Sequence, residues 1–479
     1  MNDGDVEMVP TGVCGLDELI GGGFPRKSLI VLAGNPGAGK TILSAQFLYR
    51  GCVDYGECGV YASLAESREQ FIWEMRGFGF NFEKLEEEGR FRFHESLTAK
   101  EAAAPAVLES ILEEIGKTGA KRLVIDSFSS LAQAFKEPHE ARIILHTILS
   151  RVVRYMGCTT ILIVEIPYGE EKIGLGVEEF VADGIIVLRK RRLDGRLLRD
   201  LEILKMRGTP TPEVQAVFTL KGEFKAFPPF KPKPVENPRR FKPQPDKKEY
   251  FSTGSQEMDK MLGGGYPRGS TVLIEIGEQI STLQYHLISA PTAWNFILHG
   301  RGVTLIPTRG VDHNLIRMRA EEGGLTCDEV NRLLRICVKE YPGLKPEPYI
   351  VAFKGEDAAD DYAKYLEVEQ KLIENTGQPT LHVAGVDTLI DNYGVKGALS
   401  SIRIQATRIR ERGGLGILLL KPSYPRLAKT LAALVEVHLK ITREHGAVLV
   451  YGVKPRTNLH VLEMDTSEGY PMPKITPII

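Results

Sequence analysis

Long hydrophobic runs and an excess of one charge are both missing from this 479-residue sequence. Its longest apolar runs, at 160–164 and 415–420, are far shorter than the ~18 residues of a membrane-spanning helix. The N-terminal segment is acidic and lacks the apolar core of a secretory signal. Lys and Arg number 61 against 62 Asp and Glu, so no overall field draws the chain to nucleic acid or anionic lipid. We expect a cytoplasmic protein without membrane contact.

Cysteine is also scarce. The six cysteines stand singly, without a Cys-x-x-Cys pair or a Cys/His cluster, which argues against zinc and dithiol redox sites. Such usage is typical of a reducing compartment. The chain instead has an ordinary globular composition, 43% hydrophobic and 26% charged. At about 150 residues per domain, its length suggests two to four domains.

An internal repeat indicates the domain organisation. Residues 10–32 read PTGVCGLDELIGGGFPRKSLIVL, and residues 252–274 read STGSQEMDKMLGGGYPRGSTVLI. The two stretches share T, G, D, GGG, P, R and S, and most other positions exchange one apolar residue for another. An offset of about half the chain predicts a duplicated domain rather than a short-period solenoid. We therefore expect domains at 1–220 and 251–479.

The segment between the repeats, residues 221–250, is rich in proline and basic residues. Such a segment is expected to run extended as a semi-rigid linker. Its interleaved aromatics, Phe227, Phe230 and Phe241, leave a second interpretation open, a strip that binds nucleic acid or a partner protein. The linker interpretation is favoured, because charged runs are usually solvated.

Both halves alternate short β-rich runs with amphipathic stretches, which predicts an α/β fold with two tandem, doubly wound, largely parallel sheets. Strands are expected at 28–33, 59–63, 123–126 and 160–164, with helices at 42–53 and 142–156. In the second half, strands are expected at 272–276, 303–307, 381–386 and 415–420.

The strongest motif is the phosphate-binding loop of the first half. Its eight residues are Gly34, Asn35, Pro36, Gly37, Ala38, Gly39, Lys40 and Thr41. The glycines let backbone N–H groups turn toward a phosphate, Lys40 is expected to reach the β- and γ-phosphates, and the Thr41 hydroxyl is expected to bind Mg²⁺. A β-rich run precedes the loop and a helical stretch follows it, so the helix N-terminus adds its positive end. The motif predicts that ATP and Mg²⁺ bind here.

Three acidic residues are expected at the same edge of the sheet. Asp126 ends an apolar strand and is the candidate second magnesium ligand beside Thr41, although it could also cap a helix. Glu66 lies just beyond the second strand, where a carboxylate could polarise an attacking water, unless it is only a solvated loop residue. Glu165 closes the strand TTILIVE and is a candidate sensor of the nucleotide.

The second half lacks this loop. The corresponding stretch, IGEQISTLQ at 276–284, keeps only Gly277 and has no lysine at the phosphate position, while Glu278 opposes a triphosphate. Thr308 and Arg309 replace the catalytic acids, and Asp387 is left without a phosphate cradle. We expect residues 251–479 to keep the fold as a degenerate pseudo-ATPase domain.

These stretches, together with GVEEFVADGIIVLRKRR and EILKMRGT, make the sequence resemble the KaiC-like ATPases of the RecA/DnaB superfamily, closely over about residues 9–220. The resemblance implies a hexameric ring with ATP between subunits, and Lys205 and Arg207 projecting into the neighbouring site. Lys454 and Arg456 repeat their spacing. The family commonly has two adjacent acids where this chain has Ala65-Glu66, so hydrolysis is expected to be slow. Without its loop, the second half is not expected to autophosphorylate.

Three functions therefore compete. The leading one is a slow Mg²⁺-dependent ATPase that acts as a nucleotide-controlled oligomeric switch with an unknown protein partner. The second is a RecA/RadA-like DNA-binding recombination paralogue, suggested by the basic run Arg189–Arg192 with Arg196 and Arg199; the acidic loop before it speaks against this. The third is a non-catalytic ATP-binding regulator, since the arrangement also resembles, more distantly, the archaeal gas-vesicle regulator GvpD.

Overall fold

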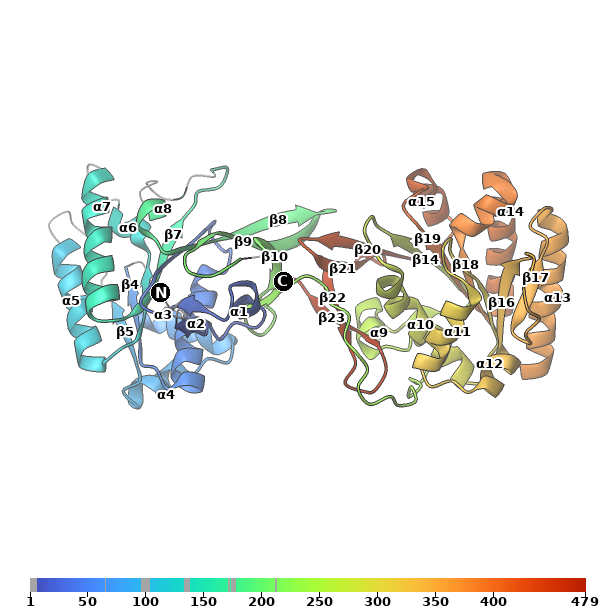
Figure 1. Cartoon of the computed structure of the whole chain (residues 1–479), viewed down its shortest axis with the longest axis horizontal. Coiled ribbons are helices and arrows are strands. Elements are labelled where there is room, and N and C mark those ends of the chain that lie inside the picture. Colours follow the sequence, from blue (N-terminus) through green and yellow to red (C-terminus); the bar gives the residue numbers. More distant parts are fainter. Residues whose placement is uncertain are drawn as a thin grey trace. The chain divides into compact units, whose positions relative to one another are not determined.

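The computed structural model describes residues 7–64, 66–95, 104–132, 138–170, 173, 178–211 and 213–479. The chain divides into two compact units (Figure 1). The first comprises Met1–Pro229 with the short segments His445–Ala447 and Pro477–Ile479, and the second comprises Phe230–Glu444 and Val448–Thr476. Within the described residues, no helix has both the length and the apolar composition needed to cross a bilayer.

A nine-stranded sheet forms the centre of the first unit, in the order β11-β10-β9-β8-β3-β7-β6-β4-β5. The strands from β8 to β5 in this order run parallel, and β9, β10 and β11 extend the sheet antiparallel. Its strands are β3 (Leu29–Gly34), β4 (Gly59–Ser63), β5 (Phe91–Glu95), β6 (Arg122–Asp126), β7 (Thr159–Glu165), β8 (Gly184–Leu193), β9 (Arg196–Met206), β10 (Gln215–Thr219) and β11 (Lys225–Phe227). A small separate sheet pairs β1 (Met8–Val9) with β2 (Phe24–Pro25).

Helices cover both faces of this sheet (Figure 1). They are α1 (Leu16–Leu19), α2 (Lys40–Tyr55), α3 (Arg68–Gly77), α4 (Phe82–Glu87), α5 (Ala104–Thr118), α6 (Phe128–Ala132), α7 (Pro138–Thr147), its π-helical continuation η2 (Ile148–Tyr155) and α8 (Glu178–Val181). Side chains of a strand alternate between faces. Ile30 and Leu32 of β3 accordingly join the core under α1–α4, whereas Leu29 and Val31 join the core under α5 and η2.

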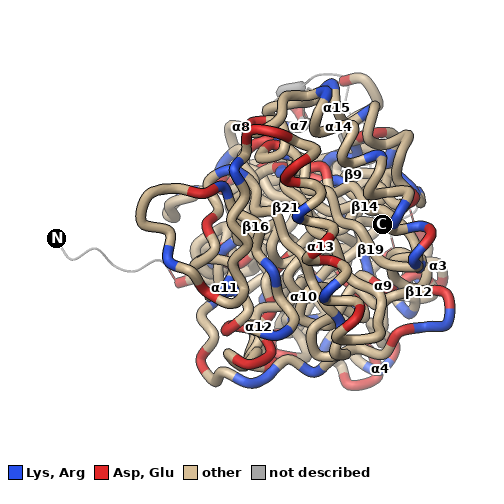
Figure 2. Tube along the Cα trace, turned by 90° about the vertical axis from the view of Figure 1, so that its right-hand side faces the viewer, with Lys and Arg blue, Asp and Glu red and all other residues tan. Residues whose placement is uncertain are grey.

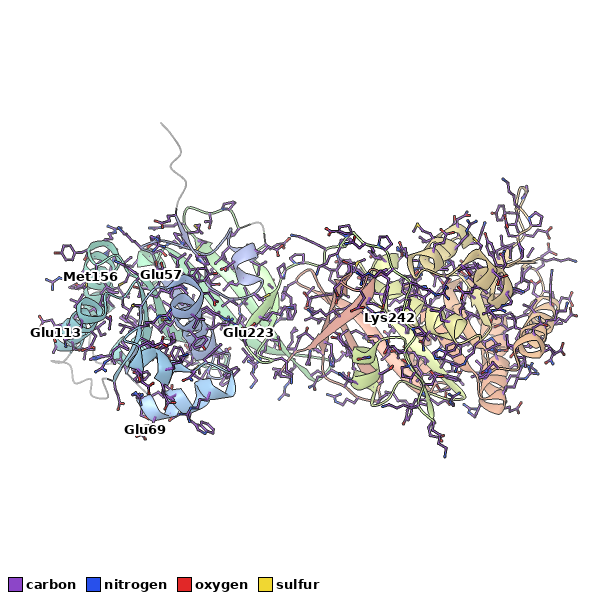
Figure 3. All side chains as sticks on the ribbon, turned by 90° about the horizontal axis from the view of Figure 1, so that it is seen from below. Glu57, Glu69, Glu113, Met156, Glu223 and Lys242 are labelled. Carbon is purple, nitrogen blue, oxygen red and sulfur yellow. The ribbon has the colours of Figure 1, made fainter. Side chains whose placement is uncertain are left out.

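A buried arginine fixes the start of β6, the strand that ends at Asp126. Arg122 is fully buried, and its guanidinium donates to the Glu57 carboxylate at 2.7 Å and to the Phe47 carbonyl at 2.9 Å. Glu57, labelled in Figure 3, also accepts from Arg26 at 3.0 Å. These two guanidinium groups lower the pKa of the Glu57 carboxyl against the opposing effect of burial. Pairing with a carboxylate and a carbonyl offsets part of the desolvation cost of this buried cation.

The second unit contains a ten-stranded sheet in the order β17-β16-β15-β18-β19-β14-β20-β21-β22-β23. Its strands are β14 (Ser270–Ile276), β15 (Val303–Ile306), β16 (Leu334–Lys339), β17 (Ile350–Phe353), β18 (Leu381–Gly385), β19 (Leu415–Leu420), β20 (Val437–Glu444), β21 (Ala447–Lys454), β22 (His460–Asp465) and β23 (Met472–Pro477), with β12 (Tyr250–Phe251) and β13 (Tyr266–Pro267) paired separately. Its helices are α9 (Gln256–Leu262), α10 (Thr282–Leu298), α11 (His313–Glu322), α12 (Cys327–Leu333), α13 (Ala358–Thr376), α14 (Val386–Arg412) and α15 (Pro425–Ala432).

The two sheets have the same strand order, apart from the additional edge strand β17. The turns before them also repeat in atomic detail. Thr11 donates through its N–H and its hydroxyl to the Asp17 carboxylate at 2.9 and 2.6 Å, and Thr253 donates in the same way to Asp259 at 2.8 and 2.7 Å. The sequence prediction of two tandem, largely parallel α/β sheets is confirmed.

The proline-rich segment at 221–250 contributes to both units. Its first part includes β11, and Phe227 belongs to the first unit with 1% of its surface exposed. Phe241 is 2% exposed and packs edge-on against Trp294 and Tyr470 in the second unit. Buried rings are not available to stack on nucleic-acid bases. Two of the three aromatics that suggested a binding strip thus serve as packing residues.

Candidate functional site

The phosphate-binding loop connects β3 to α2. Gly37 has a φ of +71° and no heavy atom within 4 Å of the position where a side chain would begin, so the loop is open on that side. Gly39 precedes α2 with a φ of +107° and has no side chain to accept the first N–H groups of the helix. Those N–H groups lack intrahelical acceptors in any helix. An open, uncapped helix N-terminus of this kind fits a phosphate.

Lys40 lies within this loop rather than in solvent. Its side chain is buried, with 7% exposure, and its ammonium donates to the carbonyls of Gly34 at 2.8 Å and Asn35 at 3.1 Å. Burial lowers the pKa of Lys40, while the nearby carboxylates of Glu165 and Asp126 oppose that shift. The structure therefore holds the Lys40 ammonium at the N-terminus of α2, where it would neutralise an anionic ligand.

Thr41 and Asp126 come together across 85 residues of sequence. The Thr41 hydroxyl donates to Asp126 Oδ2 at 3.3 Å, and the Tyr61 hydroxyl donates to the same oxygen at 2.5 Å. Burial raises the pKa of Asp126 even though these two donors and Lys40 favour the ionised form. A hydroxyl beside a carboxylate supplies the hard oxygen ligands that Mg²⁺ prefers. The site fits a magnesium ion that is completed by phosphate oxygens and water.

No group of three or more His, Cys, Asp or Glu side chains that could hold a metal occurs in the described ranges. Protein ligands alone would therefore not form a complete metal cage here. Mg²⁺ is usually bound by one or two protein groups together with substrate phosphates. The pair Thr41 and Asp126 matches that pattern.

Glu66 lies immediately beyond β4, next to the strand that ends at Asp126. Ser63 fixes its backbone: the Ser63 hydroxyl accepts from the Glu66 N–H at 2.9 Å and donates to the Glu66 carbonyl at 2.8 Å. Burial, followed by the charges of Glu74 and Asp126, raises the pKa of Glu66 to about 7. A carboxyl that titrates near neutral pH is suited to accept a proton from water. Its neighbour Ala65 lies outside the described residues.

Glu165 ends β7 with an exposed side chain, and its N–H donates to the Ser129 hydroxyl at 2.8 Å. Its charge acts on Lys40. The structure therefore brings Glu165 to the same sheet edge as Asp126 and the loop.

Several residues that brace the loop were not foreseen from sequence. The Asn35 amide donates to the carbonyls of Ile166 at 3.0 Å and Pro167 at 3.4 Å, and the Tyr168 hydroxyl donates to the Pro36 carbonyl at 3.0 Å. Tyr61 was likewise missed, because an aromatic residue inside an apolar strand gives no sign that its hydroxyl reaches a carboxylate.

Arg199 is another brace. Its guanidinium donates to the carbonyls of Gly37 at 3.0 Å and Ala38 at 3.3 Å, and only 8% of the residue is exposed. The sequence suggested that Arg199 belongs to an exposed basic run that binds nucleic acid, but the structure buries this residue. Burial also lowers the pKa of Arg199.

Two other arginines of the basic run have acidic partners across the β8–β9 hairpin. Arg189 forms an ion pair with Glu202, and Arg191 forms one with Asp200. Basic and acidic residues are interspersed along the chain in Figure 2. These counter-charges weaken the attraction of the hairpin for a phosphate backbone, while Lys190 and Arg192 are exposed.

Lys205 and Arg207 lie far from the loop of their own chain. Strand β8 lies between β3 and β9, and its residue Ile185 pairs with Val31 of β3 on one side and with Lys205 of β9 on the other. Lys205 is therefore at the height of the middle of β3. Arg207 donates its N–H to the Asp183 carbonyl at 2.9 Å, level with the first residue of β3. At about 3.3 Å per residue, Arg207 is about 16 Å from the loop along the strand direction. The structure does not bring these two cations to the loop within one subunit.

In the second unit, the corresponding helix N-terminus is closed by its own side chains. Helix α10 begins at Thr282, where α2 begins at Lys40. The Ser281 hydroxyl accepts from the Gln284 N–H at 3.4 Å, and the Gln284 side chain accepts from the Ser281 N–H at 2.8 Å. This capping box occupies two of the N–H donors that a phosphate at this helix N-terminus would need. Exposed Glu278 adds a repelling charge.

Asp387, the counterpart of Asp126 in the second unit, already has hydrogen-bond donors around its carboxylate. Asp387 is buried, and its carboxylate accepts from the N–H groups of Arg309 at 2.9 Å and Thr388 at 3.0 Å. The Thr308 hydroxyl pairs with Tyr285 at 2.8 Å, and the Lys454 ammonium donates to the Val435 carbonyl at 2.8 Å. Asp387 therefore stabilises a turn.

Comparison with known proteins finds relatives of this chain. The family described as KaiC ATPase matches residues 9–224, and the region described as GvpD basic region 2 matches residues 240–321. A UPF0273 protein of Methanocaldococcus jannaschii is 37% identical over 218 residues, 43% of this chain and 89% of that protein. A UPF0273 protein of Pyrococcus furiosus is 38% identical over 218 residues, 43% of this chain and 87% of that protein.

Among solved structures, a KaiC-like protein from Pyrococcus horikoshii is 37% identical to this chain. The match covers 47% of this chain and 100% of that one, with a TM-score of 0.43. Because the curated relatives exceed 30% identity and are matched over most of their length, the chain belongs to the KaiC-like ATPase family.

Proposed function

We propose that residues 1–220 form a slow Mg²⁺-dependent ATPase whose nucleotide state controls assembly of the chain. One observation carries the proposal: an uncapped helix N-terminus, a buried lysine and a hydroxyl–carboxylate pair meet at one edge of a parallel sheet. In open α/β sheets, ligands bind outside the carboxyl ends of the strands. Family membership implies ATP as the ligand.

Each group has a proposed role. The backbone N–H groups of residues 37–41 bind phosphate oxygens, and Lys40 neutralises the β- and γ-phosphates. Thr41 and Asp126 hold Mg²⁺, which when bound neutralises charge on the phosphates. Glu66, placed by Ser63, orients a water molecule and accepts its proton. Glu165 responds to the phosphate through Lys40.

Lys205 and Arg207 are proposed to act on the neighbouring subunit. Their distance from the loop of their own chain supports this assignment, because a cation that stabilises the transferring phosphoryl group must reach it. The Arg207 side chain is 57% exposed and pairs with Asp183 at 3.5 Å, a weak contact that a neighbouring subunit could replace. ATP held between subunits would then favour a closed ring, which we propose to be a hexamer.

The second half is proposed to be a pseudo-ATPase domain at 251–479, linked through 221–250. Its capped α10 and occupied Asp387 support loss of nucleotide binding while the fold is kept. Its match to GvpD basic region 2 favours a second candidate function, an ATP-binding regulator that acts through a protein partner with little turnover. DNA binding is less favoured, because Arg189 and Arg191 have acidic partners and Arg199 is buried.

The experiment is light scattering of the purified chain with and without Mg-ATP, with phosphate release measured in parallel. Growth to about six subunits with ATP, absent in Lys40→Ala, supports the switch. A monomer under both conditions overturns the neighbouring-subunit roles of Lys205 and Arg207. Assembly with ATP but no phosphate release, unchanged by Glu66→Gln, favours the regulator.

A further inference from the structure

On the face under α13 and α14, three positions of the second sheet carry smaller side chains than their equivalents in the first: Thr271 for Leu29, Gly416 for Thr160 and Ala384 for Ile125, whereas Ile306 replaces the smaller Ala62. Strand pairing sets the equivalent positions: one row across the first sheet is Leu123, Thr160 and Leu29, and the matching row across the second is His382, Gly416 and Thr271. Two residues further along the same strands, and on the same face, Ile125 of the first sheet corresponds to Ala384 of the second. The pairing of each residue with the neighbouring strand sets this equivalence.

These exchanges matter because the first-unit residues are fully packed. Leu29, Leu123 and Ile125 are each at most 1% exposed within the core under α5 and η2. Protein interiors are close-packed, so loss of several side-chain groups at one place leaves a cavity unless the neighbours move in. Here the space stays open.

The resulting pocket lies between the sheet and the two helices. Helix α14 is bent at Gly394 (φ 68°), and it lines the pocket with residues from both sides of the bend. The main lining residues are Ile306, Tyr362, Ala384, Tyr393, Ile402 and Gln405. The pocket has a cavity volume of about 70 Å³, counted as the space that the centres of water-sized spheres can occupy. On the same measure, one water molecule needs ~10–15 Å³. The space fits one small organic molecule.

The carboxylate, the histidine and the tyrosine hydroxyls of the lining already have hydrogen-bond partners. The His382 ring contacts Thr304 at 2.8 Å and Tyr365 at 2.7 Å through Nδ1. The Asp361 carboxylate already accepts from Tyr393 at 2.9 Å and from the N–H of Gly355 at 2.7 Å. A charged ligand would therefore find no unused counter-charge in this lining.

The Gln405 amide has an unused donor. Its side-chain oxygen accepts from the Tyr362 hydroxyl at 2.7 Å, which orients the amide. Its Nε2 is buried and has no hydrogen-bond partner. A buried donor without an acceptor is costly, and a ligand that supplies the acceptor removes that cost. The amide therefore gives the apolar pocket one polar contact.

We propose that this pocket binds a small, neutral, mainly apolar molecule that accepts one hydrogen bond from Gln405. The combination of an apolar lining with a few placed polar groups is that of small-molecule sites. The site lies on a sheet face of the second half. It does not depend on nucleotide binding by the first half, so either proposal can fail alone.

The test uses two probes of equal size, pyridine and benzene, at pH 8, where pyridine is neutral. Both are titrated into the full chain carrying ¹³C-labelled Ile methyl groups, followed by NMR. The structure predicts saturable shifts of the Ile306, Ile402 and Ile409 methyls, which line the pocket, and none at Ile30 in the first unit. In Gln405→Leu, pyridine should bind about fivefold more weakly and benzene no more weakly, the effect of one hydrogen bond.

The second variant is designed to fill the pocket. Ala384→Ile restores the residue of the first sheet and should abolish the shifts from both probes, while Lys40→Ala should leave them unchanged. Absence of saturable shifts at all three methyls overturns the proposal. So does equal weakening of both probes in Gln405→Leu. If Ala384→Ile fails to fold, the Gln405→Leu comparison decides alone.

Discussion

The rate of ATP hydrolysis should follow the ionisation of Glu66. Burial of this carboxyl, together with the charges of Glu74 and Asp126, disfavours the ionised form and raises the pKa to about 7. Only the ionised form can accept a proton from water. Activity should therefore be low below pH 6 and rise through neutral pH, because the ionised fraction increases as the pH passes the raised pKa.

The size of the effect follows from the titration curve. With a pKa of about 7, roughly a tenth of Glu66 is ionised at pH 6 and roughly nine tenths at pH 8, a change of about tenfold. An unshifted glutamate with a pKa near 4.5 would be ionised throughout this range and would give a flat profile. The measurement is kcat/KM between pH 5.5 and 8.5 at saturating Mg²⁺, since this parameter reports ionisation in the free enzyme.

Glu74 provides a matched control. Glu74→Gln removes one of the charges that raise the pKa of Glu66, so the rising limb of the profile should move to lower pH. Glu66→Gln should remove the limb together with most of the activity. A flat profile in the unmodified protein, or a limb that stays in place in Glu74→Gln, would refute the reasoning.

Three further changes test the rest of the site. Lys40→Ala should weaken fluorescent ATP-analogue binding by at least about tenfold through loss of a charge-assisted contact, whereas Thr282→Ala, at the matching place in the second half, should not alter it. Mixing inactive Glu66→Gln, which keeps Lys40 for ATP binding, with inactive Arg207→Ala should restore up to about a quarter of the ATPase rate, because random mixing joins an intact site to an intact neighbour at one interface in four; no recovery would contradict the neighbouring-subunit role. Ser281→Ala should lower the free energy of unfolding in urea by about 1 kcal/mol through loss of a helix cap, without changing ATP binding.

Contiguous features of the site could be predicted from sequence. The loop from Gly34 to Thr41 is a single motif, and Asp126 and Glu66 stand at the ends of apolar runs, so their arrival at one sheet edge follows from parallel pairing. The capping box at Ser281 also has a local signal, Ser-Thr-Leu-Gln, that pattern reading could have recognised.

Other features depend on pairings that the sequence does not reveal. The Tyr61 hydroxyl reaches Asp126 only because β4 and β6 are adjacent with Tyr61 opposite Val124. Arg199 is ten residues from Arg189 in sequence, yet the hairpin register directs it under the loop rather than into solvent. In both cases a side chain's role is set by strand register, which turn geometry and the whole core decide together.

Strand register also explains how the two halves could diverge without losing their fold. Nucleotide binding depends on residues at the strand ends and on the first turn of one helix, whereas the Thr–Asp turn and the strand order are kept in both halves. Closing α10 with Ser281 and Gln284 therefore removes a ligand site without disturbing the sheet. The same independence applies to the sheet face: a change such as Ile to Ala at position 384 opens space between layers but leaves every ladder hydrogen bond in place, because backbone pairing does not depend on side-chain volume. A duplicated α/β domain can thus lose one site at its edge and gain another on its face by separate small steps.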